Sequence, residues 1–264
     1  MLAVAVIGRG AIGAPVIEAL RGDRLPGARL SGVLARSVRA EEEEVDSLDA
    51  LLARRPGLVI EAAGQGPARA MAAEILASGT DLLLFSVGAL ADSRFEAECA
   101  EAGRAGGGRL FISTGAVGGL DMLRTLRAAG TLERVTLRST TRSAALVQPW
   151  MAPEEAERIR AATEPLTVFE GSAREACLSF PASANVAAAI ALSSLGLDRV
   201  CVTIVADPGT PVKRHAIEAV SPECTMRLEV ENLISPENPR TSRITPYAAL
   251  RFISDRTEAT IAGD

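Results

Sequence analysis

The sequence has few of the residues that most often carry metal or acid-base chemistry. Among 264 residues there is one histidine, His215, and one lysine, Lys213, and aromatic residues make up 3% of the chain. Four cysteines, at positions 99, 177, 201 and 224, stand singly without a CxxC pair, so the spacing predicts neither a zinc site nor a disulfide framework. We therefore expect no metal, and buried thiols in a reducing compartment.

Long apolar runs and clusters of positive charge are also missing. The net charge is -5, and the densest basic cluster is Lys213 with Arg214, so no nucleic-acid partner is expected. The apolar stretch 2–7 is too short for a signal peptide, and 184–195 is short and rich in small residues, like a packed core helix. These absences predict a soluble cytoplasmic protein, without membrane contact, whose partners are small molecules or copies of itself.

What is present is a regular alternation of short apolar runs with helical patterns. Strands are predicted at 3–7, 30–34, 58–62, 82–86 and 110–113, and helices at 12–20, 47–53, 68–77 and 94–105. Such alternation is typical of an α/β fold with a parallel, doubly wound sheet. We predict a Rossmann dinucleotide-binding domain at 1–117.

The pattern changes after residue 118. Helices are predicted at 120–129, 154–162 and 185–195, and strands around 132–139, 199–206 and 226–231. This predicts a second, catalytic and dimerisation α/β domain at 118–240, with a mostly antiparallel sheet. We interpret Thr241 and Ser242 as helix caps, because an apolar stripe follows them. This stripe predicts a C-terminal helix within 241–264 that packs back on the first domain.

A glycine pattern follows the first predicted strand. Its residues are Gly8, Gly10, Ala11, Ile12 and Gly13, in a GxGxxG arrangement before a helix. The glycines allow a tight turn, close approach of a pyrophosphate to backbone N–H groups, and close packing of helix on strand. We therefore assign this loop to the phosphates of NAD or NADP, at the positive end of the helix.

The acidic residue that usually accompanies this loop is missing. In NAD-binding domains an Asp or Glu about 20 residues further on binds the ribose hydroxyls, but no acid occurs between Asp23 and Glu41. The second strand instead leads to Arg36 and Ser37, a guanidinium and a hydroxyl suited to a 2′-phosphate. We predict that both contact the cofactor and that NADP is accepted, either alongside NAD or in preference to it.

Seven further segments, taken together, carry a family likeness. They are 61–65 (EAAGQ), 86–92 (SVGALAD), 114–121 (TGAVGGLD), 169–176 (FEGSAREA), 180–188 (FPASANVAA), 206–208 (ADP) with His215, and 238–242 (NPRTS). In this order they resemble the L-aspartate dehydrogenase family over nearly the whole chain.

The resemblance implies a Rossmann domain followed by an α/β domain like that of homoserine dehydrogenases, in a homodimer. It implies reversible oxidation of L-aspartate by NAD or NADP, through iminosuccinate to oxaloacetate and ammonia. By the family pattern Ala116 and Asn185 contact the nicotinamide end of the cofactor, and His215 matches the active-site histidine. On the same resemblance we assign four more motif residues to the cofactor: Ala63, Ser86, Val87 and Gly88.

The chemistry of the residues agrees with a role for His215. Imine hydrolysis needs a positioned base, and the reverse reaction needs an acid. His215 is the one side chain whose unperturbed pKa lies near neutrality, and we expect it on a strand or turn between the strands at 199–206 and 226–231. A dicarboxylate also needs cationic or amide partners. The candidates are Lys213, Arg142 and Arg240.

Several positions depart from the family pattern. The chain has Ala182 and Ser183 where the family commonly has lysine and asparagine, and Lys213 where it has asparagine. These positions leave two alternatives open. The first is a dehydrogenase or imine reductase for another amino acid, and the second is a non-catalytic dinucleotide-binding sensor.

Overall fold

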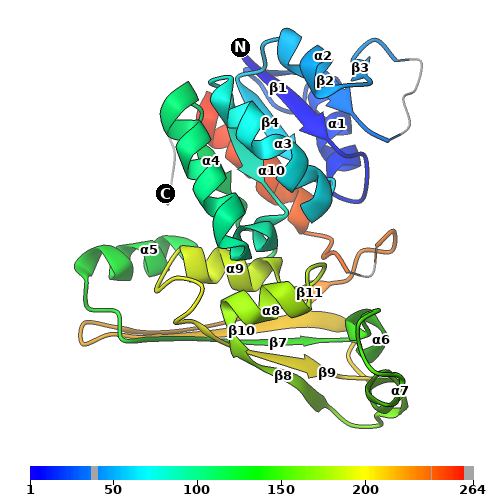
Figure 1. Cartoon of the computed structure of the whole chain (residues 1–264), viewed down its shortest axis with the longest axis vertical. Coiled ribbons are helices and arrows are strands. Elements are labelled where there is room, and N and C mark those ends of the chain that lie inside the picture. Colours follow the sequence, from blue (N-terminus) through cyan, green and yellow to red (C-terminus); the bar gives the residue numbers. More distant parts are fainter. Residues whose placement is uncertain (37–40, 239, 259–264) are drawn as a thin grey trace. The chain divides into compact units, whose positions relative to one another are not determined.

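The computed structural model describes residues 1–36, 41–238 and 240–258, and the chain divides into two compact units (Figure 1). Unit 1 combines Met1–Gly115 with Thr245–Asp264, and unit 2 is Ala116–Ile244. The divisions lie at residues 115 and 244, where the sequence suggested 117 and 240.

Unit 1 contains the parallel sheet that the apolar runs predicted. Its strands are β1 (Leu2–Ile7), β2 (Ala28–Leu34), β3 (Glu44–Val45), β4 (Leu58–Glu61), β5 (Asp81–Leu84) and β6 (Leu110–Ile112), in the order β3-β2-β1-β4-β5-β6. Every pairing among them is parallel. β4 is wholly buried, as expected for a central parallel strand covered on both faces. The Rossmann-type α/β fold is therefore confirmed.

The helices of unit 1 follow the strands and return the chain across the sheet. They are α1 (Gly13–Arg21), α2 (Leu48–Ala53), α3 (Gln65–Ala77), the short 3-10 helix η1 (Val87–Ala91), α4 (Ser93–Gly106) and α10 (Thr245–Thr257). α10 comes from the far end of the chain, yet Ala249 and Ile253 are fully buried in one core cluster with Val16 and Ile17 of α1. The C-terminal helix thus belongs to the first unit.

The predicted helix caps before α10 were wrong. The helix begins at Thr245, so Thr241 and Ser242 lie outside its first turn. Ser242 instead forms an isolated antiparallel bridge with Ile234. Among the described helices, none is long and apolar enough to cross a membrane.

Unit 2 is built on a mixed sheet. Its strands are β7 (Arg134–Thr141), β8 (Leu166–Ser172), β9 (Cys201–Ala206), β10 (Val212–Val220) and β11 (Thr225–Leu233), in the order β11-β10-β7-β9-β8. Among these strands only β7 and β9 run parallel, so the mostly antiparallel prediction is confirmed. Its helices are α5 (Leu120–Ala129), α6 (Ser143–Leu146), α7 (Pro153–Ala161), α8 (Ala173–Ser179) and α9 (Asn185–Leu192).

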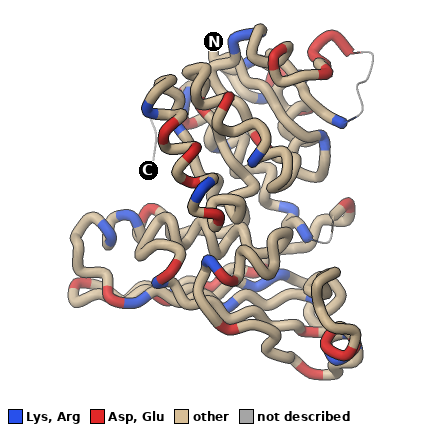
Figure 2. The backbone as a smooth tube through the Cα atoms, viewed as in Figure 1, with Lys and Arg blue, Asp and Glu red and all other residues tan. Residues whose placement is uncertain are grey.

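The two faces of this sheet differ. α5, α8 and α9 lie over one face, here called the inner face (Figure 1). Along β10 the buried residues Lys213, His215, Ile217 and Ala219 alternate with half-buried neighbours, so side chains at odd positions lie on the inner face. The opposite, outer face carries ion pairs between strands, such as Arg214 with Glu231 at 2.5 Å. Lys and Arg are interspersed with Asp and Glu in both units (Figure 2).

Candidate active site

The glycine loop of unit 1 has three glycines with three different surroundings. Gly8 has φ +98°, and a Cβ there would lie 2.6 Å from the carbonyl oxygen of Ala62. A Cβ on Gly13 would lie 2.0 Å from the Gly8 oxygen, whereas nothing lies within 4 Å of the corresponding position at Gly10. Gly8 and Gly13 are therefore required by the turn and by packing, and Gly10 leaves open space where a pyrophosphate approaches in such folds.

The helix that follows this loop leaves its N-terminus uncapped by side chains. α1 begins at Gly13, and no side chain forms a cap hydrogen bond at its N-cap, Ile12. Backbone N–H groups and the helix dipole then favour an anion at this end. Together with Ala11, these residues form one continuous loop at the carboxyl end of β1, and they fit the pyrophosphate of NAD or NADP.

A buried carboxylate joins two more segments that the sequence assigned to the cofactor. Glu61, 1% exposed, ends β4 and accepts hydrogen bonds from the N–H groups of Ala63 at 2.8 Å and Gly64 at 2.9 Å. It also accepts from the N–H and the hydroxyl of Ser86, both at 3.0 Å. Burial raises the pKa of Glu61, while these hydrogen bonds oppose the rise. Glu61 thereby fixes Ala63 and Ser86 next to one another.

The other unit 1 residues assigned to the cofactor follow Ser86 or the end of β2. Val87 and Gly88 are buried in η1. Arg36 is exposed just beyond the end of β2, and Ser37 lies outside the described residues. The acidic run at 41–44 is partly structural, because Glu44 is buried and forms an ion pair with Arg9 of the glycine loop.

In unit 2, His215 lies in the middle of β10 and not in a turn. It pairs with Ser139 of β7, and Ser139 Oγ shares a hydrogen bond with His215 Nδ1 at 2.8 Å. Burial, together with the neighbouring Lys213 ammonium, lowers the pKa of His215 from 6.5 to about 4. The imidazole is therefore neutral at pH 7 and able to act as a base.

Lys213 lies two residues earlier on the same inner face. Its ammonium is buried and donates to the carbonyl oxygen of Arg240 at 2.5 Å. Burial, and to a smaller extent the charge of Arg240, lowers the pKa of Lys213 from 10.5 to about 8. Opposite it on β11, the side-chain amide of Asn232 donates to the Ala116 oxygen at 2.9 Å. Ala116 is thus held to the sheet, and Asn185 is the first residue of α9.

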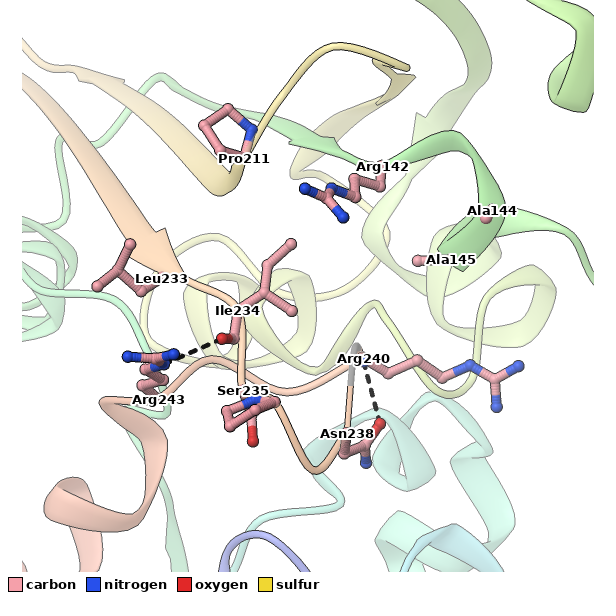
Figure 3. Close-up of a pocket in the computed structure, with 11 residues that line it drawn as sticks. Arg142, Ala144, Ala145, Pro211, Leu233, Ile234, Ser235, Asn238, Arg240 and Arg243 are labelled. Atoms are coloured by element: carbon pink, nitrogen blue, oxygen red, sulfur yellow. Dashed lines mark hydrogen bonds between the residues drawn. The ribbon is translucent and has the colours of Figure 1, made fainter.

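A pocket of about 800 Å³ opens at the end of the unit 2 sheet, near Lys213 (Figure 3). Arg142, Arg240 and Arg243 line it, and within the described part of the chain none of them forms an ion pair with a carboxylate. Arg142 donates to the Thr210 oxygen at 3.0 Å, and its guanidinium is directed between Pro211 and Ile234 (Figure 3). The pocket is suited to an anionic ligand.

Sequence reasoning singled out His215, Lys213, Arg142 and Arg240 as candidates, but not Ser139. Ser139 lies 76 positions away in the chain, and only the register of β7 against β10 brings it to the histidine. The sequence around Ser139 does not mark it out, because hydroxyl residues occupy all of 139–141 and therefore lie on both faces of the strand.

Known protein families and individual proteins match this chain over nearly its whole length. The family described as "Homoserine dehydrogenase, NAD binding domain" matches residues 8–113, and "Aspartate dehydrogenase, C-terminal" matches residues 121–256. The chain is 38% identical to an L-aspartate dehydrogenase of Ruegeria pomeroyi, over 97% of this chain and 93% of that protein. It is 32% identical to an L-aspartate dehydrogenase of Methanocaldococcus jannaschii, with all of both chains covered.

Solved structures show the same arrangement of elements. A crystal structure of an aspartate dehydrogenase from Thermotoga maritima matches with a TM-score of 0.78 and 25% identity, over all of both chains. A hyperthermophilic archaeal homoserine dehydrogenase in complex with NADPH matches with a TM-score of 0.59 at 11% identity, over 100% of this chain and 99% of that one. The second match supports the fold alone.

Proposed function

The chain belongs to the L-aspartate dehydrogenase family, and on that premise we propose that it interconverts L-aspartate with oxaloacetate and ammonia through iminosuccinate, using NAD or NADP. The observation that carries the proposal is the buried, neutral imidazole of His215 beside Ser139. An uncharged imidazole in a largely apolar site suits the abstraction and return of a proton, and does not suit a surface role.

The glycine loop holds the cofactor in this proposal. The pyrophosphate is bound by Gly8, Gly10 and Gly13 together with the N-terminus of α1. Further contacts with the cofactor come from Ala63, Ser86, Val87 and Gly88. The adenosine ribose is contacted by Arg36 and Ser37. Ala116 and Asn185 are the proposed contacts for the nicotinamide. When bound, the cofactor supplies the acceptor for the hydride that leaves C2 of aspartate.

His215 then transfers the protons of the reaction. We assign the Nδ1 proton to the hydrogen bond with Ser139 Oγ, and in that tautomer His215 Nε2 keeps a lone pair. This nitrogen takes a proton from the water that attacks C2 of iminosuccinate, and returns a proton to the departing nitrogen. In the opposite direction the same imidazole passes protons between the attacking amine and the departing oxygen.

The carboxylates of the substrate need fixed cations. Lys213 is the buried candidate, and Arg142 and Arg240 line the neighbouring pocket. We propose that this set selects a dicarboxylic substrate. Because Lys213 occupies a position where asparagine is usual, a panel of amino acids is the direct check on specificity.

The experiment that tests the function is oxidation of NADPH and NADH by the purified chain across a panel of 2-oxo acids with ammonium. Oxaloacetate is expected to give the highest kcat/KM. The variant His215→Ala is expected to lose at least about a hundredfold in kcat while still binding NADPH. Highest turnover on another 2-oxo acid overturns the assignment of aspartate, and binding without turnover on the whole panel indicates a sensor.

We also propose a cytoplasmic homodimer. The outer face of the unit 2 sheet supports this, since no described helix lies over it and it carries charges of both signs, which can pair across a self-complementary twofold interface. The four cysteines are unpaired, which supports a reducing compartment.

A further inference from the structure

A second, much smaller cavity lies inside unit 2 beside His215. Its volume is about 20 Å³, and it lies between the inner face of the sheet and the start of α9. Its polar lining comes from Ser139, Thr140, Thr141, Ser183, Lys213 and His215, and its apolar lining from Leu146, Ala184, Ala187, Val202 and Ile204.

Two hydroxyl groups in its wall have no protein partner. Thr141 Oγ1 and Ser183 Oγ are buried and form no hydrogen bond within the described residues. Buried hydroxyls are normally satisfied, because an unmade hydrogen bond costs stability. Thr141 lies on the same inner face as Ser139, two residues along β7, so its hydroxyl belongs to the same polar cluster as the imidazole.

The cavity matches one very small polar molecule. A space of about 20 Å³ is that of a single water, and a buried water needs two to four polar partners. Two unpartnered hydroxyls, the Lys213 ammonium and the His215 imidazole supply that number. Ammonia has nearly the same size and also forms several hydrogen bonds, whereas one added methyl group exceeds the space.

We propose that this cavity binds the small nucleophile of the reaction, ammonia in the direction of amination and water in the direction of deamination. The inference rests on the proposed function. The occupant is neutral, because the neighbouring Lys213 and Arg240 are both cationic and no carboxylate lines the cavity among the described residues.

The chemistry assigns a clear task to each hydroxyl. Ammonia needs its nitrogen lone pair to attack C2 of the oxo acid, so Thr141 Oγ1 and Ser183 Oγ accept its N–H hydrogens and leave that lone pair directed outward. The new C–N bond forms, the nitrogen gives up two protons, and the carbonyl oxygen gains two and leaves as water, with His215 passing the protons between them. A bound reduced cofactor would supply the hydride that the imine carbon needs, and the imine nitrogen takes a proton.

Loss of the hydroxyls tests the site. Thr141→Val and Ser183→Ala keep the shape of the wall and remove one hydroxyl each. Each is expected to raise the KM for ammonium by roughly three- to tenfold, the effect of one hydrogen bond, with the KM for oxaloacetate little changed. The matched control is Ser143→Ala, since Ser143 Oγ is also buried and unpartnered but does not line the cavity.

Size gives an independent test. The wild-type chain is expected to use ammonium and to reject methylamine. Ile204→Val removes one methyl group from the cavity wall and is expected to raise the ratio of methylamine to ammonium turnover several-fold. Ile190→Val makes the same deletion at a buried position of α9 outside the cavity and is expected to leave that ratio unchanged.

The outcomes separate the two proposals. If the wild-type chain aminates no 2-oxo acid, the proposed function fails and this inference fails with it. If amination occurs but Thr141→Val and Ser183→Ala keep the wild-type KM for ammonium, or shift it no more than Ser143→Ala does, only the nucleophile site is overturned. Equal use of methylamine by the wild-type chain overturns it as well. Thermal melting and NADPH binding of each variant confirm that it is folded.

Discussion

At the scale of single residues, the chemistry depends on two basic side chains on one strand. Lys213 and His215 are both buried on the inner face of β10, and each pKa lies below its usual value. A base with a lowered pKa stays unprotonated over more of the pH range. His215 is therefore available as a base through the whole physiological range, and acid is needed to switch it off.

This arrangement predicts the acid limb of the pH profile. Below the pKa of about 4 the imidazole is protonated and cannot act as a base, so kcat/KM for L-aspartate should fall only in that region. Lys213→Met removes the neighbouring charge but leaves the burial that is the larger cause of the lowered pKa, so it should move the limb part of the way toward 6.5. Lys213→Arg keeps the charge and should leave the limb in place. Initial rates of NADP reduction against pH measure this, and identical limbs in all three proteins would contradict it.

Arg36 carries the prediction on cofactor choice. It is exposed beyond β2, where the ribose 2′-phosphate of NADP lies in such folds. Arg36→Ala should weaken NADPH binding by about tenfold, the value of one charge-assisted hydrogen bond, and leave NADH binding unchanged. Arg29→Ala, at the opposite end of β2 and also exposed, is the control. Fluorescence titration decides, and the assignment is wrong if the NADPH to NADH ratio does not change.

At the scale of elements, the turn between β1 and α1 depends on the third glycine of the loop. A methyl group at Gly13 meets the Gly8 carbonyl oxygen, so Gly13→Ala should lower the free energy of unfolding by about 1 to 3 kcal/mol and weaken dinucleotide binding. Gly66→Ala lies in α3 with open space around it and should instead be neutral or stabilising. Denaturant unfolding of both variants measures the contrast, which equal losses would refute.

The elements that the sequence predicted, and those it did not, differ in how they are buried. The central strands of unit 1 are continuous apolar runs, so β1, β4 and β5 were predicted close to their observed positions. β10 was only partly recognised, because its buried positions include Lys213 and His215, which remove the expected alternation of apolar and polar residues. β8 was not predicted as a strand, since it is an edge strand without a fully buried residue.

The residues of the candidate site also differ in how far the sequence predicted them. The glycine loop is local in sequence, so a short-range pattern identifies it, and its role in binding the cofactor stays a prediction. The Ser139 hydroxyl and the unpartnered Thr141 and Ser183 hydroxyls come together only through sheet register and the docking of α9, which short-range patterns do not encode.

At the scale of the whole molecule, the proposed dimer is directly measurable. If the outer face of the unit 2 sheet forms a twofold interface, sedimentation should give twice the mass of the chain. Arg214→Glu places like charges beside Glu231 and Glu229 and should shift the protein toward monomers. Arg94→Glu, in the exposed α4 pair with Glu98, should not. A monomeric wild-type protein, or a dimer indifferent to both changes, contradicts this interface.

The position of α10 has a consequence for the order in which the protein is made. The core of unit 1 includes Ala249 and Ile253, which a ribosome adds only after all of unit 2 has been synthesised. Unit 2 is one continuous segment, so its chain can begin to fold while the nucleotide-binding unit still exposes the apolar surface of α1. A nascent or prematurely terminated chain that ends before residue 245 therefore presents an unfinished core to chaperones and proteases.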